Sequence, residues 1–465
     1  MRGGALLLLV ARLVSAATTL AVLAIAARVN PVQLGAVGIG AAAGAIGAAL
    51  VDAGTSSLLI RDASRRPGDV GPLLGFGLCV ETVTGPTVLL ATTVVLASLF
   101  GAAWPAMLAM AAALVVQQTA ELTRACFIAA RRFRIAAGHS MVENVAWLGV
   151  VAGMIAAGAP LAEALAAGVA VMAGSVAAGL VLVRMLLGTR PQLPRISTAR
   201  RLLGALRPFV AFNVLGVAYG RVDTILVGAL VPASGLALAG VYFTAARLMA
   251  VAEFVPDAVA RSLYPEVARA YAGDPRSVNA LVRPALGILL AFALPVPVVF
   301  AISGDAILRL LIGPAGAGAG LLAAGLALAV PIRSISYLLG MSLTSADAQG
   351  RRVLAAGSAL VLVGLVDAVF LPRVGIPAAV VGSFVAAVAV ALVYVRSFAA
   401  RFGPLDITTD VARAAAATAL AAAPGGLASA LLGPWPAIVV FALAYLLVTA
   451  AVNPTPITTL RRSSG

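Results

Sequence analysis

The sequence predicts an all-α polytopic membrane protein with about 14 transmembrane helices, and three observations support this fold class. The first is composition. Of 465 residues, 62% are hydrophobic and 11% are charged, and the mean hydropathy is +1.08, whereas a soluble domain is roughly half apolar and a quarter charged. The second is the recurrence of apolar runs of membrane-spanning length. The third is an uneven distribution of arginine between the loops that join these runs.

The transmembrane helices are predicted from runs of about 20 mainly apolar residues. Fourteen runs meet this length: 4–28, 34–60, 73–100, 104–128, 136–158, 163–187, 208–230, 235–260, 281–303, 317–343, 352–371, 377–398, 410–432 and 434–452. The tenth run is rich in Gly and Ala, and only the residues GPWP separate the last two runs. Twelve or thirteen spans therefore remain alternatives.

The loop arginines predict the orientation of the chain. All 32 residues in the Lys and Arg count are Arg. If the N-terminus is cytoplasmic, the outer loops hold only Arg28, Arg309 and Arg373, and the other loop arginines lie inside. This asymmetry follows the positive-inside rule, so we expect a multi-pass protein of the cell membrane with both termini cytoplasmic. It also accounts for most of the net charge of +15, and we expect no nucleic-acid partner.

The loops are too short to hold a soluble catalytic domain, because none is much longer than about 20 residues. The chain has no GxxxxGK[ST] phosphate loop and no cluster of metal-ligand residues. Cys79 and Cys126 lie inside apolar runs, and the single histidine, His139, lies at the inner start of the fifth run. We therefore predict a transporter that works by moving helices and is not an enzyme, with no catalytic residues, no metal and no cofactor.

Two related halves are predicted around the stretch 188–207, which is rich in Pro and Arg and follows six runs. A shift of 205 residues aligns Gly35 with Gly240 and Asp52 with Asp257, each in the second helix of its half. A parallel repeat of this kind would form two six-helix bundles around a central cavity. The predicted divisions are an N-terminal six-helix bundle over 1–187, a cytoplasmic linker over 188–207, a C-terminal six-helix bundle over 208–398, and two additional transmembrane helices with a cytoplasmic tail over 399–465.

Four arginines lie within the predicted spans without an obvious partner on their own helix: Arg12, Arg221, Arg247 and Arg333. A charged side chain in lipid costs about 2.5 kcal/mol or more, so these residues are tolerable only along a polar cavity. Guanidinium groups bind phosphate in a bidentate manner. We therefore predict that the four arginines line the cavity and bind an anionic substrate, and a structural role is the alternative for each.

Three aspartates are candidates for structural or ion-coupling roles: Asp52, Asp223 and Asp257. Asp223 follows Arg221 by two residues, which places the two side chains on different faces of a helix. We expect Asp223 to tie its helix to a neighbouring one. Asp257 is spaced to neutralise Arg261 on the same helix.

The remaining acidic residues of the spans are predicted to be structural. Glu121 and Arg124 are three residues apart and can form an ion pair on one helix. Glu81 and Glu143 lie within about two turns of a predicted membrane surface, where a long side chain can extend to water.

The segment 221–247 contains the pattern R-x-D-x-ILVG, a short outer turn, GVY, AA and a final Arg. It resembles the signature of the seventh and eighth helices in oligosaccharide flippases of the polysaccharide-transporter family, within the multidrug/oligosaccharidyl-lipid/polysaccharide exporter superfamily. The similarity extends over nearly the whole chain. The chain departs from the family pattern at Val37, where the family usually has an aromatic residue, and in having no Lys. Further segments that are similar to this family are 27–39, 52–64, 264–271 and 371–383.

The resemblance implies a flippase that translocates an undecaprenyl-diphosphate-linked oligosaccharide across the bacterial cell membrane by alternating access, for synthesis of cell-envelope polysaccharide. It implies that the cavity arginines bind the diphosphate or acidic sugars. The expected partners are the lipid-linked oligosaccharide, membrane lipids and, as candidate protein partners, a polysaccharide polymerase or glycosyltransferases. We expect a monomer.

Two other functions remain open from the sequence. A multidrug/cation antiporter of the sister family would share the architecture, but it would favour carboxylates over arginines in its cavity. A non-transporting membrane scaffold of a polysaccharide assembly complex would have no reason to bury unpaired arginines.

Overall fold

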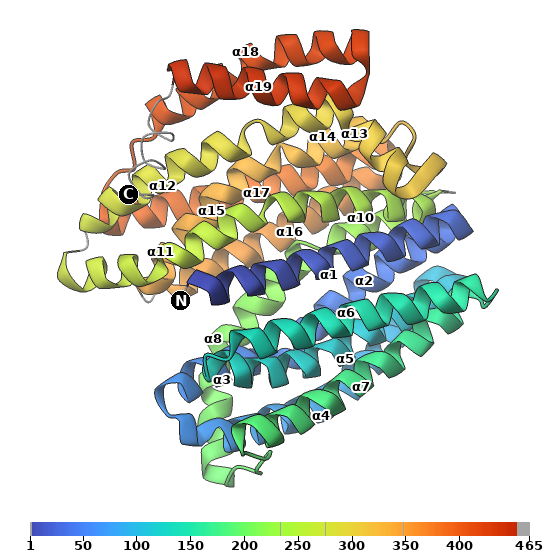
Figure 1. Ribbon diagram of the computed structural model, residues 1–465, viewed down its shortest axis with the longest axis vertical. Helices are drawn as coiled ribbons and strands as arrows, with labels where there is room; N and C mark the ends of the chain where they lie inside the picture. Colours follow the sequence, from blue (N-terminus) through green and yellow to red (C-terminus); the bar gives the residue numbers. More distant parts are fainter. Residues whose placement is uncertain (1, 233, 275, 347, 453–465) are drawn as a thin grey trace. The chain divides into compact units, whose positions relative to one another are not determined.

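The protein is almost entirely helical in a computed structural model that describes residues 2–232, 234–274, 276–346 and 348–452 (Figure 1). Within these ranges the chain forms the helices α1 to α19 and three short 3-10 helices, η1 to η3. No strand occurs in the described part of the chain. The predicted all-α fold class is confirmed.

The chain divides into two compact units, Met1–Phe243 and Thr244–Gly465. The first unit contains α1 (Arg2–Val29), α2 (Pro31–Asp52), α3 (Thr55–Arg65), η1 (Pro67–Asp69), α4 (Val70–Phe100), η2 (Gly101–Ala103), α5 (Trp104–Ala129), α6 (Phe133–Ala156), α7 (Leu161–Leu187), α8 (Ile196–Tyr219) and α9 (Val222–Leu230). The boundary falls within α10 (Gly235–Ala252). The second unit contains α11 (Phe254–Gly273), α12 (Ser277–Ala293), α13 (Val296–Ile312), η3 (Gly313–Gly316), α14 (Gly320–Ala327), α15 (Ala329–Ser345), α16 (Gln349–Val374), α17 (Pro377–Phe402), α18 (Thr408–Leu432) and α19 (Pro434–Val452).

The predicted membrane spans agree with the apolar helices. Twelve stretches of the described residues are long and apolar enough to cross a membrane. One of them, Val70–Ala129, contains the two successive helices α4 and α5, and α8 with α9 forms a further, bent pair. When α4 and α5 are counted separately and the bent pair is counted once, the stretches follow the predicted runs in order. The count of 14 is approximate, because Ser277–Gly316 also contains two helices, α12 and α13.

Helix α2 is the centre of packing in the first unit. It contacts α1, α4, α5, α8 and α9, so helices on both sides of the non-helical segment 188–195 pack on it. The predicted division at 188–207 refers to a sequence repeat and stays a prediction.

Two glycines one turn apart allow α2 to approach α5 closely. A Cβ atom at Gly40 would lie 2.5 Å from the carbonyl oxygen of Met107, and one at Gly44 would lie 2.7 Å from the Cα of Ala111. Small residues at this spacing let helix backbones approach in a membrane, where packing replaces the hydrophobic effect as the main source of helix association.

The second predicted run, 34–60, is too long, because α2 ends at Asp52. The next two residues, Ala53 and Gly54, have φ values of 46° and 86°, in the left-handed region. The Asp52 carboxylate accepts hydrogen bonds from the backbone N–H groups of Gly54 at 3.1 Å and Ser56 at 3.0 Å. One side chain therefore stabilises the turn and satisfies the free N–H groups at the start of α3.

Helix α15 is the centre of packing in the second unit. It contacts α11, α12, α14, α16 and α17, and α13 packs on α14. The last two helices, α18 and α19, lie side by side and contact α12 and α13 (Figure 1). These last two helices thus pack on other helices of the second unit, and their predicted status as an addition to a six-helix bundle stays a prediction.

Gly35 and Gly240, the pair aligned by the predicted repeat, pack against each other. A Cβ atom at Gly35 would lie 1.8 Å from the carbonyl oxygen of Leu236, and one at Gly240 would lie 2.6 Å from the backbone nitrogen of Gly35. These two glycines let α2 and α10 approach closely, and the repeat that aligns them stays a prediction.

Gly35→Ala and Gly240→Ala are each expected to lower the free energy of unfolding by about 1–3 kcal/mol, because a new methyl group would meet backbone atoms that cannot rotate away. The measurement is the melting temperature of the purified protein in detergent. Gly149→Ala is the control, since a Cβ there meets nothing within 4 Å and alanine favours a helix over glycine. Equal melting temperatures for Gly35→Ala and Gly149→Ala would contradict the close approach.

Candidate functional site

The seventh span is broken at Gly220 and Arg221. Helices α8 and α9 meet there with a bend of 43°, whereas the sequence predicted one continuous span over 208–230. Glycine is a weak helix former, which accounts for a break at this point. The break places Arg221 immediately before the first turn of α9, at the positive end of that helix.

Asp223 holds α9 to the neighbouring helix α10. It is buried in the first turn of α9, where its carboxylate accepts hydrogen bonds from the Tyr242 hydroxyl and, at 2.8 Å, from the Thr224 N–H. An acidic side chain is favourable in this first turn because of the helix dipole. The predicted contact with a neighbouring helix is present, and any ion-coupling role of Asp223 stays a prediction.

Arg221 is half-buried beside an aromatic ring. Its guanidinium carbon lies 5.6 Å from the centre of the Phe243 ring. A guanidinium above an aromatic face is held by a cation–π interaction, which leaves its N–H groups directed to the side. The guanidinium therefore lies against the Phe243 ring next to the broken helix.

Arg12 is the second predicted substrate-binding arginine of the first unit, and a negatively charged residue lies near it. It lies on α1 and interacts electrostatically with Glu121 of α5. Glu121 also pairs with Arg124 at 3.0 Å, as its spacing predicted. Arg12 is thus part of a mixed cluster of acidic and basic groups.

A buried polar network, which we define as Gln117, Arg124, His139, Glu143 and Ser175, joins α5, α6 and α7. Arg124 donates to the Glu143 carboxylate at 2.9 Å, and Gln117 donates to its other oxygen at 2.9 Å. The Ser175 hydroxyl also donates to Glu143. The Nε2 of His139 lies 3.1 Å from the Ser175 carbonyl oxygen, which only accepts, so this nitrogen carries the proton.

Glu143 and Glu81 do not extend to a membrane surface, so that part of the sequence analysis was wrong. Their exposed fractions are 2% and 3%. For Glu143 the reason is the ion pair with Arg124, which repays the loss of hydration. The sequence analysis considered only how far Glu143 lies along its own helix. It did not reveal Arg124 as the partner, because Arg124 lies on another helix, α5.

Glu81 belongs to a second buried cluster, with Asp52, Thr55 and Asn213. Thr55 lies 3.3 Å from Asp52 and 3.4 Å from Glu81, and the Asn213 amide lies 3.4 Å from Asp52. Two carboxyl groups thus share one hydroxyl inside the first unit. Asp52 was predicted as a structural or ion-coupling candidate, and the geometry shows its structural contacts.

In the second unit, Arg333 has a counter-ion that the sequence did not reveal. Its guanidinium lies 3.0 Å from Glu253 and donates to the Ser383 hydroxyl at 3.0 Å. Glu253 also accepts a hydrogen bond from the Tyr337 hydroxyl at 3.1 Å. Glu253 and Arg333 are 80 residues apart, so no helical spacing rule could have paired them.

The other predicted residues of the second unit are half-buried. Arg247 lies on α10, and Asp257 lies on α11, where it interacts electrostatically with Tyr337. The predicted pair of Asp257 with Arg261 falls outside the described residues, because the Arg261 side chain is not among them. Within the described residues no group of three or more His, Cys, Asp or Glu could hold a metal ion.

Comparison with protein families gives a direct match. A family model described as "Polysaccharide biosynthesis protein" matches residues 25–315, more than half of the chain. A comparison with curated protein sequences gave no match.

Solved structures show the same fold at low sequence identity. A lipid II flippase MurJ in an inward closed conformation is 14% identical, with a TM-score of 0.68, and the match covers 92% of this chain and 98% of that one. A MOP superfamily transporter from Pyrococcus furiosus is 12% identical, with a TM-score of 0.61 and coverage of 85% and 96%. An inward-facing multidrug resistance MATE family transporter is 14% identical, with a TM-score of 0.61 and coverage of 86% and 95%.

Arg124→Ala is expected to destabilise the protein by about 3–5 kcal/mol, because it leaves the buried Glu143 without its counter-ion. The measurement is the yield of monodisperse protein and its melting temperature in detergent. Arg309→Ala is the control: Arg309 pairs with Asp305 at 2.8 Å, but both side chains are largely exposed, and such pairs contribute about 1 kcal/mol or less. Normal yield and melting temperature for Arg124→Ala would contradict the assigned role of the network.

Proposed function

Because the chain belongs to the family of polysaccharide biosynthesis proteins, we propose that it is a flippase for an undecaprenyl-diphosphate-linked oligosaccharide of the bacterial cell envelope. The proposal includes translocation across the cell membrane by alternating access. The observation that carries it is the arginine at the broken seventh span, where a positive helix end and a guanidinium lie together. Both features favour an anion.

The chemistry of Arg221 suits a diphosphate. A guanidinium presents parallel N–H donors that match two phosphate oxygens, and these charge-assisted bonds are about twice as strong as neutral ones. The Phe243 ring restricts the guanidinium plane, so less conformational freedom is lost when the anion binds. The carboxylate of the neighbouring Asp223 already accepts hydrogen bonds from the Tyr242 hydroxyl and the Thr224 N–H, and these bonds stabilise its negative charge.

The other three arginines are proposed as further contacts to phosphate or acidic sugars. Arg12 and Arg333 each interact with a glutamate, Glu121 and Glu253 respectively. An anionic substrate would therefore share or displace these carboxylates. When the substrate replaces a glutamate as the partner of an arginine, a contact within the protein is lost. Substrate binding is in this way coupled to a change of conformation.

We extend the proposal to partners and assembly. The protein acts as a monomer in the membrane, and a polysaccharide polymerase or glycosyltransferases supply and consume its substrate. These partners handle the same lipid-linked sugar on either side of the translocation step.

Cation antiport is a second candidate function, and one observation favours it. Asp52 and Glu81 place two buried carboxyl groups around Thr55 in the first unit, and such groups suit a proton or cation site. The fold is shared with transporters of the multidrug resistance MATE family.

Arg221→Ala and Arg221→Lys are both expected to slow flipping by about 10- to 100-fold, because lysine keeps the charge but lacks the planar pair of donors. The measurement is the accumulation of the lipid-linked sugar in each leaflet, with protein abundance determined in the same membranes. Asp223→Asn is expected mainly to lower abundance, because it weakens the contact of α9 with Tyr242.

Arg184→Ala is the matched control, since it removes one exposed arginine at the end of α7. It is expected to leave flipping unchanged. Normal flipping by Arg221→Ala at normal abundance would show that Arg221 does not contact the substrate, and a structural role would replace the proposed one.

A further inference from the structure

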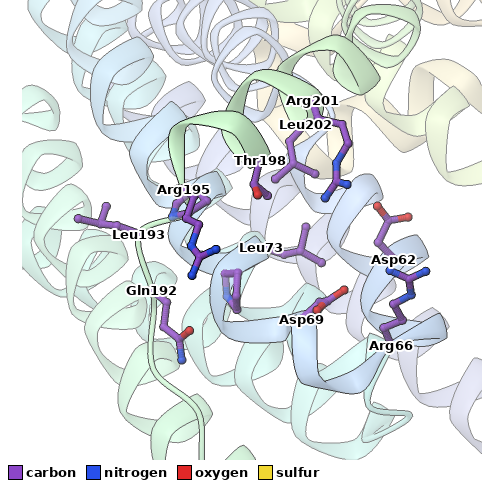
Figure 2. A pocket seen from close by; sticks show the side chains of 12 residues that line it. Asp62, Arg66, Asp69, Leu73, Gln192, Leu193, Arg195, Thr198, Arg201 and Leu202 are labelled. Carbon is purple, nitrogen blue, oxygen red and sulfur yellow. The ribbon is translucent and has the colours of Figure 1, made fainter.

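A charged pocket of about 630 Å³ lies in the first unit, away from the arginines discussed above. Its walls come from two loops of the chain that the positive-inside rule places on the cytoplasmic side. Figure 2 shows one group of lining residues from α3, η1 and the start of α4, and another from the segment before α8 and its first turns: Asp62, Arg66, Asp69, Gln192, Arg195, Thr198 and Arg201.

The pocket is built on a fixed base. Gln192 donates its backbone N–H to the Gly71 carbonyl oxygen at 3.0 Å, which attaches segment 188–195 to α4. A Cβ atom at Gly75 would lie 2.0 Å from the carbonyl oxygen of Gln192, so only glycine permits this approach. The floor includes Leu73 and Leu202, both members of the buried apolar core of this unit. The backbone at Gln192 and the two leucines are therefore held in place without a ligand.

Positive charge in the pocket exceeds the available counter-charge. Arg66, Arg195 and Arg201 are exposed, and none of them makes an ion pair with another described residue. Asp62 is engaged by Arg61, whose Nε lies 2.7 Å from its carboxylate. Asp69 is then the remaining acidic group among the lining residues. Three guanidinium groups around one pocket favour an anion with several oxygens, such as a phosphate.

Exposed apolar side chains flank these arginines. Leu193, Ile196 and Leu203 have exposed fractions of 83%, 76% and 51%. Apolar side chains interspersed with arginine are typical of segments that lie in the membrane interface. There the apolar side chains enter the acyl region, and the arginines bind anionic headgroups. This combination suits a site at the level of the phospholipid headgroups and an occupant with an apolar tail.

We propose that this pocket binds the phosphate headgroup of an anionic phospholipid from the cytoplasmic leaflet. Arg195 and Arg201, from the segment before α8, and Arg66, from the loop before α4, bind the phosphate oxygens. Leu193 and Ile196 contact the acyl chains. The bound lipid joins the connection between α3 and α4 to the segment that leads into α8, the first half of the broken seventh span.

The test uses the purified full-length protein in dodecyl maltoside, titrated separately with dioleoylphosphatidylglycerol and dioleoylphosphatidylcholine. Bound lipid is counted by native mass spectrometry. We expect one phosphatidylglycerol to be retained in preference to phosphatidylcholine. Arg195→Gln/Arg201→Gln is expected to weaken this binding by about tenfold or more, because two charge-assisted contacts are lost.

Arg132→Gln/Arg134→Gln is the matched control, because it removes two exposed arginines from another cytoplasmic loop. It is expected to change binding by less than about twofold. All four side chains are exposed, and melting temperatures without added lipid check that both variants are folded. If the double variant is unfolded, Arg195→Gln and Arg201→Gln are tested singly, with a measurable loss expected for each.

Three results would overturn the proposal. The first is unchanged phosphatidylglycerol binding by the folded pocket variant. The second is an equal loss in the control, which would show attraction by general charge. The third is saturation of the pocket by sodium phosphate or pyrophosphate alone, with displacement of phosphatidylglycerol, which would assign the site to a soluble anion.

Discussion

The ion pair of Arg124 with Glu143 organises the polar interior of the first unit. Through Gln117, Ser175 and His139 it connects the helices α5, α6 and α7. A charge inside a membrane needs a partner, and a partner on another helix fixes how the two helices pack. Arg333 and Glu253 serve the second unit in the same way. In these two cases a glutamate of the same unit compensates the charge of the arginine. An arginine inside a helix bundle therefore does not by itself indicate a substrate contact.

The helices are also interrupted where polar groups gather. Asp52 ends α2 and supports the first turn of α3, and Arg221 lies at the break before α9. Non-helical backbone is tolerated within a membrane protein only where it is enclosed by protein or lines a polar cavity. The break beside Arg221 is therefore a feature of the first unit that suits the anionic substrate proposed above.

The sequence was sufficient for the spans and their order, because a run of apolar residues specifies a membrane helix largely by itself. It also predicted the contact of Asp223 with a neighbouring helix and the pairing of Glu121 with Arg124. It missed the partners of Glu143 and Arg333, since those lie on other helices at no fixed spacing. The end of α2 was missed because it depends on the left-handed backbone at Ala53 and Gly54, which a hydropathy pattern does not contain.

The most direct test of the account is transport by the purified protein in liposomes. The substrate is a fluorescent polyprenyl-diphosphate-linked oligosaccharide, and its leaflet is determined by access to a membrane-impermeant quencher. The account predicts protein-dependent equilibration between the leaflets, slower by about tenfold or more when a monophosphate replaces the diphosphate, because contacts with charged oxygens are lost. Equilibration no faster than in protein-free liposomes, together with cation-gradient-driven efflux of ethidium, would contradict it and establish the antiporter instead.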